Sequence, residues 1–260
     1  MLFKIAIPST LFAAIEFIPK NVLKGNGFDT TAFMWETLGG CTYWFTSALI
    51  VAELILLLLL LTRQKHIWVY AVIALALFFV GNYMATEHIN LCGLSRDPWM
   101  FKWGLLALPF LAAGGLYWRY EEQIHRLLKW YVLLALVIVY GVVFTLWSDE
   151  VQVLISTLSI NAIGLLVCIV ASITMAELCK YLPKIGLLTF IGQYSITFYF
   201  MSGATPIVFG LLVSKFVGVS PLGYAIVLIT SLVTAYLGTY IINGWLPWVL
   251  DLRVIFKKSI

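Results

Sequence analysis

The sequence predicts an all-α protein in which a polytopic bundle of transmembrane helices makes up almost the whole chain. Of its 260 residues, 62% are hydrophobic and only 11% are charged, whereas a soluble domain carries about 25% charged residues because its surface faces water. The apolar residues also form long unbroken runs, such as residues 54–61. Such runs lack the alternation of a transmembrane β-barrel strand, so helices remain as the way to satisfy the backbone in a bilayer.

Eight segments are long and apolar enough to be spans, since a transmembrane helix needs about 20 mostly apolar residues. The first, 3–19, is interrupted by Lys4, Pro8 and Glu16. The other seven are 41–62, 67–86, 100–118, 128–148, 152–176, 190–214 and 222–249. Trp and Tyr cluster near several of their ends, as they do in the aromatic belts of membrane proteins. The whole chain, 1–260, is therefore expected to form one integral membrane domain.

The distribution of basic residues predicts the orientation. Eight spans place both termini on one side, and the side richer in Lys and Arg is cytoplasmic. The richer side holds Lys4, Arg63, Lys65, Arg119, Arg126, Lys129, Lys180, Lys184, Arg253, Lys257 and Lys258, and the other holds Lys20, Lys24, Arg96, Lys102 and Lys215. Both termini are thus predicted to be cytoplasmic, with the polar connections 20–40 and 87–98 outside. The stretch 177–189, which mixes charged and apolar residues, is expected to lie along the inner surface.

The charge and the cysteines exclude several classes of function. The formal net charge of +4 comes from short basic clusters between apolar runs, which is not the pattern of a nucleic-acid-binding surface. The four cysteines show no CxxC spacing and no matching histidines, so no metal site is expected. The sequence also holds no phosphate-binding loop, serine nucleophile elbow or zinc-protease motif.

Glu53 is the first candidate functional residue, because it lies in the middle of the span 41–62 among Leu and Ile. An ionisable side chain inside a bilayer costs about 2.5–3.5 kcal/mol on insertion scales, so it is a functional candidate by default. Glu53 could hold a substrate hydroxyl, pair with a cation or accept a proton. The alternative is a protonated carboxyl that hydrogen-bonds a neighbouring helix.

The span 190–214 opens with a polar stripe. Ser195, Tyr199 and Ser202 are spaced i, i+4 and i+7, which places them on one helical face. A face of hydroxyls suits a carbohydrate or acyl pathway, and it also suits helix packing through small polar residues. Pro206 is expected to kink this helix and to free a backbone carbonyl.

Three stretches, in order, resemble motifs of the acyltransferase 3 family, the integral membrane O-acyltransferases that modify sugars on bacterial surface polysaccharides. Residues 43–54, YWFTSALIVAEL, are similar to the family's "LWFL-x-ALF" helix opening, with an acidic residue further on at Glu53. Pro98-Trp99 followed by residues 107–115, ALPFLAAGG, resembles its "alPFF-x-x-G" helix. Residues 190–199, FIGQYSITFY, resemble its "iG-x-x-S-l-x-i-Y" run. The resemblance covers about residues 40–250.

The sequence also departs from the family pattern. Family members have about ten spans, with an essential Arg–His pair near the outer end of the first, and this chain has no such pair. Residues 1–8 resemble the family's entry into the third span, so the chain is expected to be an N-terminally shortened form. Ser202 stands where the family often has a histidine. An inactive remnant or accessory subunit of the same fold therefore stays an alternative, as does a transporter of small molecules or lipid-linked sugars.

The resemblance implies an enzyme of a bacterial inner membrane. It would transfer an acyl group, usually acetyl, from acetyl-CoA to a hydroxyl of a cell-surface sugar or a lipid-linked polysaccharide, with membrane lipid as its other partner. The residues expected to line the catalytic path are Glu53, Ser195, Tyr199 and Ser202. Those expected to meet the CoA phosphates are Arg119, Arg126 and Lys129. The acceptor sugar and the oligomeric state stay open.

Overall fold

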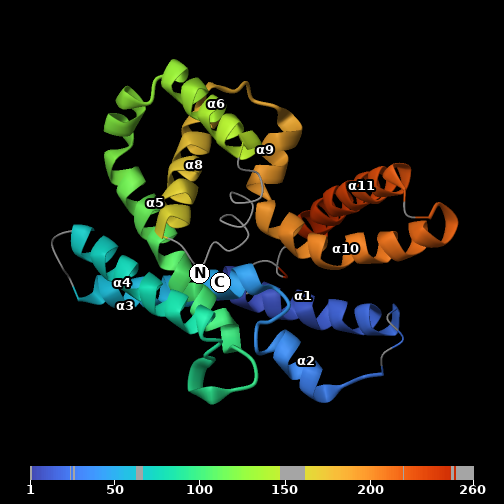
Figure 1. Cartoon of the computed structure of the whole chain (residues 1–260). Coiled ribbons are helices and arrows are strands. Elements are labelled where there is room, and N and C mark those ends of the chain that lie inside the picture. The colour runs from blue at the N-terminus through green and yellow to red at the C-terminus, as the bar shows by residue number, and fades with distance from the viewer. Residues whose placement is uncertain are drawn as a thin grey trace, which may run out of the picture. The chain divides into compact units, whose positions relative to one another are not determined.

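The computed structural model describes residues 2–23, 25, 27–62, 67–146, 162–218, 220–246 and 249. Within these residues the chain is built of helices and contains no strand (Figure 1), which confirms the predicted all-α class. The chain divides into two compact units. The first unit consists of residues 1–50, 98–100 and 184–260, and the second of residues 51–97 and 101–183.

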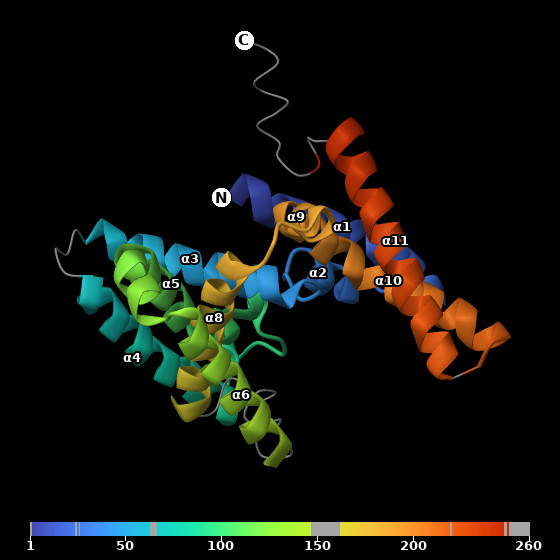
Figure 2. The ribbon, with the colours of Figure 1, turned by 90° about the horizontal axis from the view of Figure 1, so that it is seen from above.

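The first unit joins helices from both ends of the chain. Its elements are α1 (Leu2–Leu23), α2 (Thr30–Thr37), the first turns of α3 (Trp44–Leu61), the 3-10 turn η2 (Pro98–Met100), α9 (Gly186–Gln193), α10 (Ser195–Phe216) and α11 (Pro221–Trp245). Helices α10 and α11 lie side by side (Figures 1 and 2), and α1 packs against both α2 and α10. The core of this unit therefore depends on contacts between residues far apart in the sequence.

The second unit is organised around α5. It comprises the rest of α3, α4 (Ile67–Thr86), η1 (Leu91–Gly93), α5 (Phe101–Leu127), α6 (Trp130–Leu146) and α8 (Ala162–Tyr181). Helix α4 packs along α5, and α8 contacts both α5 and α6. A Cβ atom on Gly81 would lie 2.8 Å from the Leu105 Cβ and 3.0 Å from the Lys102 carbonyl oxygen. The missing side chain thus lets α4 and α5 approach closely, as small residues do between membrane helices.

Five helical segments of the described part are long and apolar enough to cross a membrane. They are Trp44–Leu61, Trp68–Gly93, Pro98–Leu127, Gly164–Tyr181 and Pro221–Trp245. Large apolar side chains on them are exposed, with Leu58 at 64% and Leu228 at 62% of their maximal area. Apolar surface of this extent needs surroundings that are themselves apolar, and the helices satisfy their own backbone hydrogen bonds. These helices are those of an integral membrane protein.

The observed helices follow the predicted segments, with differences in detail. Helix α4 coincides with the predicted span 67–86. Helix α1 has the length of a span but carries Glu16, Lys20 and two prolines, and the apolar part of α6, Trp130–Val142, is short for a span. The predicted segment 152–176 starts outside the described residues. Eight spans and cytoplasmic termini therefore stay predictions.

Helix α10 is bent, as Pro206 led us to expect. Its segments Ser195–Gly203 and Thr205–Phe216 meet at 44°, and together they count as a sixth candidate span. Proline has no N–H to donate to the carbonyl four residues earlier, here that of Ser202. The Thr205 hydroxyl donates to the Met201 carbonyl at 2.6 Å, so a side chain bonds the backbone within this bend.

Helix α2 was not predicted, because it lies within the polar connection 20–40. Its N-cap is Asp29, whose carboxylate accepts hydrogen bonds from the backbone N–H groups of Thr31 at 2.8 Å and Ala32 at 3.3 Å. An aspartate in this position is among the most favourable N-caps. The Asp29-Thr30-Thr31 sequence was therefore a signal that could have revealed the helix.

Candidate functional site

Helix α1 carries a carboxyl group on its buried face. Ile5, Ser9, Phe12 and Glu16 follow each other at intervals of three or four residues, which is the spacing of one helical face, and all four are buried. Glu16 itself is only 9% exposed. A carboxyl group in this position is stable only when it is hydrogen-bonded or paired.

Tyr43, just before α3, meets both Glu16 and α10. Its hydroxyl donates to the Phe200 carbonyl at 2.9 Å, and it also shares a hydrogen bond with the Glu16 carboxyl group. The rings of Phe12 and Phe200 stack beside them, with centroids 5.0 Å apart. A phenol keeps its proton at neutral pH, so the Tyr43 hydroxyl is a hydrogen-bond donor here.

Gly203 of α10 makes room for the carboxyl group. A Cβ atom at this position would lie 2.6 Å from the Glu16 Oε2 and 3.2 Å from the Tyr43 hydroxyl oxygen. One turn earlier, the Tyr199 ring lies 5.6 Å from the Tyr43 ring, measured between centroids. We call Glu16, Tyr43, Tyr199 and Gly203 the Glu16 cluster. All four belong to the first unit.

The Glu16 cluster places one hydroxyl donor beside two acceptors. The Tyr43 phenol has a single proton and two neighbouring acceptors, the Phe200 carbonyl and the Glu16 carboxyl group. Turning the hydroxyl toward Glu16 stabilises the charged form of the carboxyl group, and turning it toward the Phe200 carbonyl removes that stabilisation. Buried carboxyl groups in such surroundings serve as general bases in many enzymes.

The structure places the predicted hydroxyl stripe only partly in this cluster. Ser195, Tyr199 and Ser202 all lie on α10. Tyr199 contacts Tyr43, whereas Ser195 and Ser202 are exposed, and the Ser202 hydroxyl donates to the Tyr199 carbonyl at 2.7 Å. From the sequence alone, Glu16 is only an interruption of the predicted span 3–19. The sequence signal for its burial is that Glu16 falls on the same helical face of α1 as Ile5 and Phe12.

The other predicted site residues lie in the second unit. Glu53 is half-buried on α3, next to the fully buried Ala52. Arg119, Arg126 and Lys129 are exposed at or just beyond the C-terminal end of α5. Arg126 faces Glu122 at 3.9 Å on the surface.

A second buried carboxyl group, Glu177, was not singled out from the sequence. It is fully buried near the end of α8, where it accepts hydrogen bonds from the Tyr117 hydroxyl at 2.6 Å and the Lys180 ammonium at 2.8 Å. The His125 Nδ1 lies 2.8 Å from its other oxygen. Lys180 also donates to Glu121 at 2.7 Å. We call these five residues the Glu177 network.

The Glu177 network joins the C-terminal ends of α5 and α8. These ends therefore lie together, as expected if residues 119–129 and 180–184 share one side of the membrane. The Glu177–Lys180 spacing of i, i+3 was a signal for this pair in the sequence, but the burial of Glu177 depends on the packing of α8 against α5.

No group of three or more His, Cys, Asp and Glu side chains in the described part could hold a metal ion. No family model, no curated protein and no solved structure matches this chain.

Proposed function

We propose that this protein is an O-acyltransferase of a bacterial inner membrane. It would transfer an acyl group, acetyl in the simplest case, from acyl-CoA to a hydroxyl of a cell-surface sugar or lipid-linked polysaccharide. The helices that suit a membrane and the ordered motifs of residues 43–54, 98–115 and 190–199 support this proposal. The observation that most supports the proposal is the buried Glu16 carboxyl group. It lies beside the Tyr43 phenol and next to Gly203, which has no side chain to displace it.

In the proposed reaction Glu16 is the general base. It takes the proton of the acceptor hydroxyl while that oxygen attacks the thioester carbonyl carbon of acyl-CoA. The carbon–sulfur bond then breaks, and CoA leaves as a thiolate that takes up a proton. General-base assistance of this kind contributes about 10²–10⁴-fold to a rate. Tyr43 is a positioning residue, because its hydroxyl links the carboxyl group to the α10 backbone.

The remaining predicted residues keep supporting roles in this proposal. In the first unit, Tyr199 and Ser202 are proposed to border the acceptor hydroxyl, with Ser195 at the start of the same helix. In the second unit, Glu53 keeps the role that the resemblance implies, and so does the basic end of α5 as the candidate for the CoA phosphates. Arg119 and Lys129 form no ion pair within the described residues, whereas Arg126 pairs with Glu122, so Arg119 and Lys129 are the better phosphate ligands.

The test is acyl transfer by the purified protein in nanodiscs, with radiolabelled acetyl-CoA and a panel of saccharide acceptors. We expect Glu16→Gln to lower the rate about 10²–10⁴-fold, and Glu87→Gln, the same change at an exposed glutamate, to leave it unaltered. Glu53→Gln is measured beside them. If only Glu53→Gln lowers the rate of acyl transfer, the general base is Glu53 in the second unit and not Glu16. Absence of label transfer to every acceptor would overturn the proposal.

A further inference from the structure

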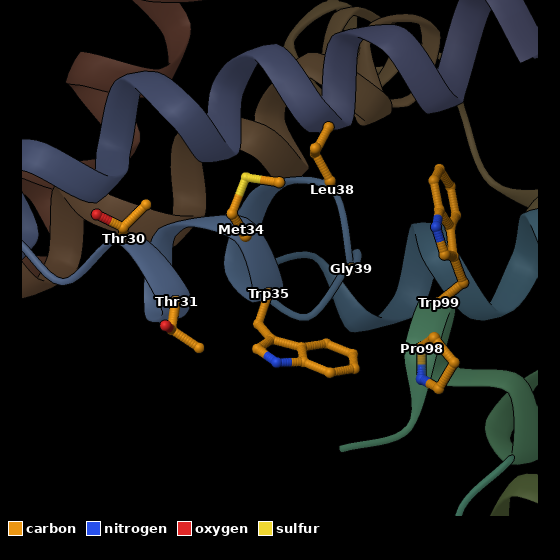
Figure 3. A pocket seen from close by; sticks show the side chains of 8 residues that line it. All are labelled: Thr30, Thr31, Met34, Trp35, Leu38, Gly39, Pro98 and Trp99. Atoms are coloured by element: carbon orange, nitrogen blue, oxygen red, sulfur yellow. The ribbon is translucent and has the colours of Figure 1, made fainter. Parts of the chain in front are cut away.

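A pocket of about 460 Å³ opens in the first unit between α2 and the Pro98–Met100 turn. Figure 3 shows Trp35, from α2, and Trp99, from that turn, lining it from two separate segments. Its lining residues are Thr30, Thr31, Met34, Trp35, Leu38, Gly39, Pro98 and Trp99. The volume lies in the range of about 300–1,000 Å³ that is typical of small-molecule sites.

The α2 side of this pocket is shaped by two adjacent glycines. A Cβ atom on Gly39 would lie 2.7 Å from the Trp35 ring, so the backbone packs directly on the indole. Gly40 has a φ of +70° and passes close to Ser47, whose hydroxyl donates to the Gly40 carbonyl at 2.7 Å. Side chains at these two positions would collide with Trp35 and Ser47. The backbone at Gly40 also has the left-handed conformation that glycine adopts readily.

On the opposite side of the pocket, two residues adopt a backbone conformation that costs free energy. Trp99 and Met100 both have a φ of +52°, which is uncommon for residues with a Cβ and concentrates at functional sites. The Trp99 N–H donates to the Gly39 carbonyl at 2.7 Å, which ties the two sides together. The Trp99 side chain also packs against the cluster of Ile5, Ala6 and Ile50. Both indoles are therefore fixed before any ligand arrives.

The lining chemistry selects the ligand class. The residues that line the pocket carry no charge, which disfavours a phosphate-bearing ligand such as acyl-CoA. The two indoles offer flat apolar faces and N–H donors that bond no protein group within the described residues, and Thr30 and Thr31 add hydroxyls that are exposed. A saturated ring with an apolar C–H face and a rim of hydroxyls complements this surface. That is the chemistry of a pyranose sugar.

We propose that this pocket binds a pyranose ring of the saccharide acceptor. The C–H face of the sugar stacks on the Trp35 indole, its hydroxyls bond the Thr31 side chain one turn earlier on α2, and Trp99 borders the ring from the other segment. That the bound sugar is the acceptor depends on the proposed function, whereas the binding of a pyranose is inferred from the pocket alone. Residues 30–39 belong to a connection that the charge distribution places outside, and the connection 87–98 leads to Pro98 and Trp99, so the pocket lies on the side where a cell-surface sugar is found.

Saturation-transfer NMR on the nanodisc-embedded protein tests this inference in the absence of acyl-CoA. The probes are the methyl β-pyranosides of glucose, galactose and N-acetylglucosamine, with adenosine and phosphocholine as competing ligand classes, and no sugar-based detergent is used. We expect at least one pyranoside to bind. Its affinity should fall about 10-fold or more in Trp35→Leu, which keeps apolar volume but loses the ring, and should persist in Trp35→Phe.

Trp118→Leu is the matched control, because Trp118 is 80% exposed in the second unit, and it should bind the pyranoside like the unaltered protein. Binding by adenosine or phosphocholine alone, no pyranoside binding, or equal binding in Trp35→Leu would each overturn the inference. The two proposals fail separately. Pyranoside binding without any acyl transfer would refute the acyltransferase, whereas acyl transfer with an acceptor KM unaltered by Trp35→Leu would refute the pocket assignment.

Discussion

Two of the buried carboxyl groups, Glu16 in the first unit and Glu177 in the second, are held in different ways. Around Glu177 the described neighbours are hydrogen-bonding groups at charged helix ends: a lysine, a histidine and a tyrosine. Around Glu16 the described neighbours are the Tyr43 phenol, aromatic rings and a glycine whose missing side chain leaves space. The described contacts of Glu177 are thus with several donors, whereas those of Glu16 combine a hydrogen bond from a phenol with the space that Gly203 leaves.

This difference separates a structural role from a chemical one. Removing one partner of a buried ion pair destabilises a protein strongly, because the other charge stays without compensation. Glu177 is therefore expected to matter for the stability of the α5–α8 contact. Glu16 lies where a small displacement alters its reach, so its position is expected to matter for activity. The following substitutions test this contrast.

The largest effect is expected from Glu177→Ala. Tyr117, His125 and Lys180 would lose their shared acceptor, which should lower the free energy of unfolding by about 3 kcal/mol. Glu122→Ala is the control, because Glu122 is 91% exposed and surface pairs contribute about 0–1 kcal/mol. Unfolding in mixed micelles, followed by helical circular dichroism, measures both. Equal losses of unfolding free energy in the two variants would show that the Glu177 network does not stabilise the contact between α5 and α8.

Gly203→Ala should lower acyl transfer about 10²-fold while the fold persists. The new methyl group would lie 2.6 Å from the Glu16 Oε2 and push the carboxyl group aside, and a misplacement near 1 Å can cost about that factor. Gly210→Ala on the same helix is the control, since its Cβ would meet nothing within 4 Å. It should keep full activity and gain about 0.5–1 kcal/mol of stability. Unaltered transfer in Gly203→Ala would argue against a role for Glu16.

Tyr43→Phe should have a smaller effect on both properties. It leaves the buried Phe200 carbonyl without the hydroxyl that donates to it, which costs about 1–3 kcal/mol. Transfer should fall less than in Gly203→Ala, because the loss of one hydrogen bond displaces the Glu16 carboxyl group less than a new methyl group does. Tyr224→Phe, at a tyrosine that is 68% exposed, should alter neither value. A complete loss of transfer in folded Tyr43→Phe would instead make the phenol itself catalytic.

The smallest effect is expected from Lys20→Ala. Lys20 pairs with Glu36 at 3.4 Å, and both side chains are about a quarter exposed, so the loss in unfolding free energy should be within about 1 kcal/mol. Because salt screens such pairs, the difference from the unaltered protein should shrink in 0.5 M NaCl. A loss as large as that of Glu177→Ala would show that burial of the carboxyl group is not what separates the two ion pairs.

The helices were predictable because each of them is encoded locally. Unbroken apolar runs of about 20 residues have no other stable form in a bilayer, and the segment 67–86 matches α4 to the residue. The bend of α10 followed from Pro206, a single residue with a single effect. Helix α2 was missed because its polar, eight-residue sequence lacks length, although its Asp29 cap was readable.

What the sequence by itself determined is the kind of protein: an all-α chain with helices suited to a membrane, and the motifs that favour acyl transfer. Only the tertiary structure decided which polar residues meet. Glu16, Tyr43 and Gly203 come together through packing of α1 and α10 near the start of α3, and Trp35 and Trp99 come together through one backbone hydrogen bond between distant turns. The physical reason is that helix formation is a property of neighbouring residues, whereas a site depends on long-range contacts that no local pattern specifies.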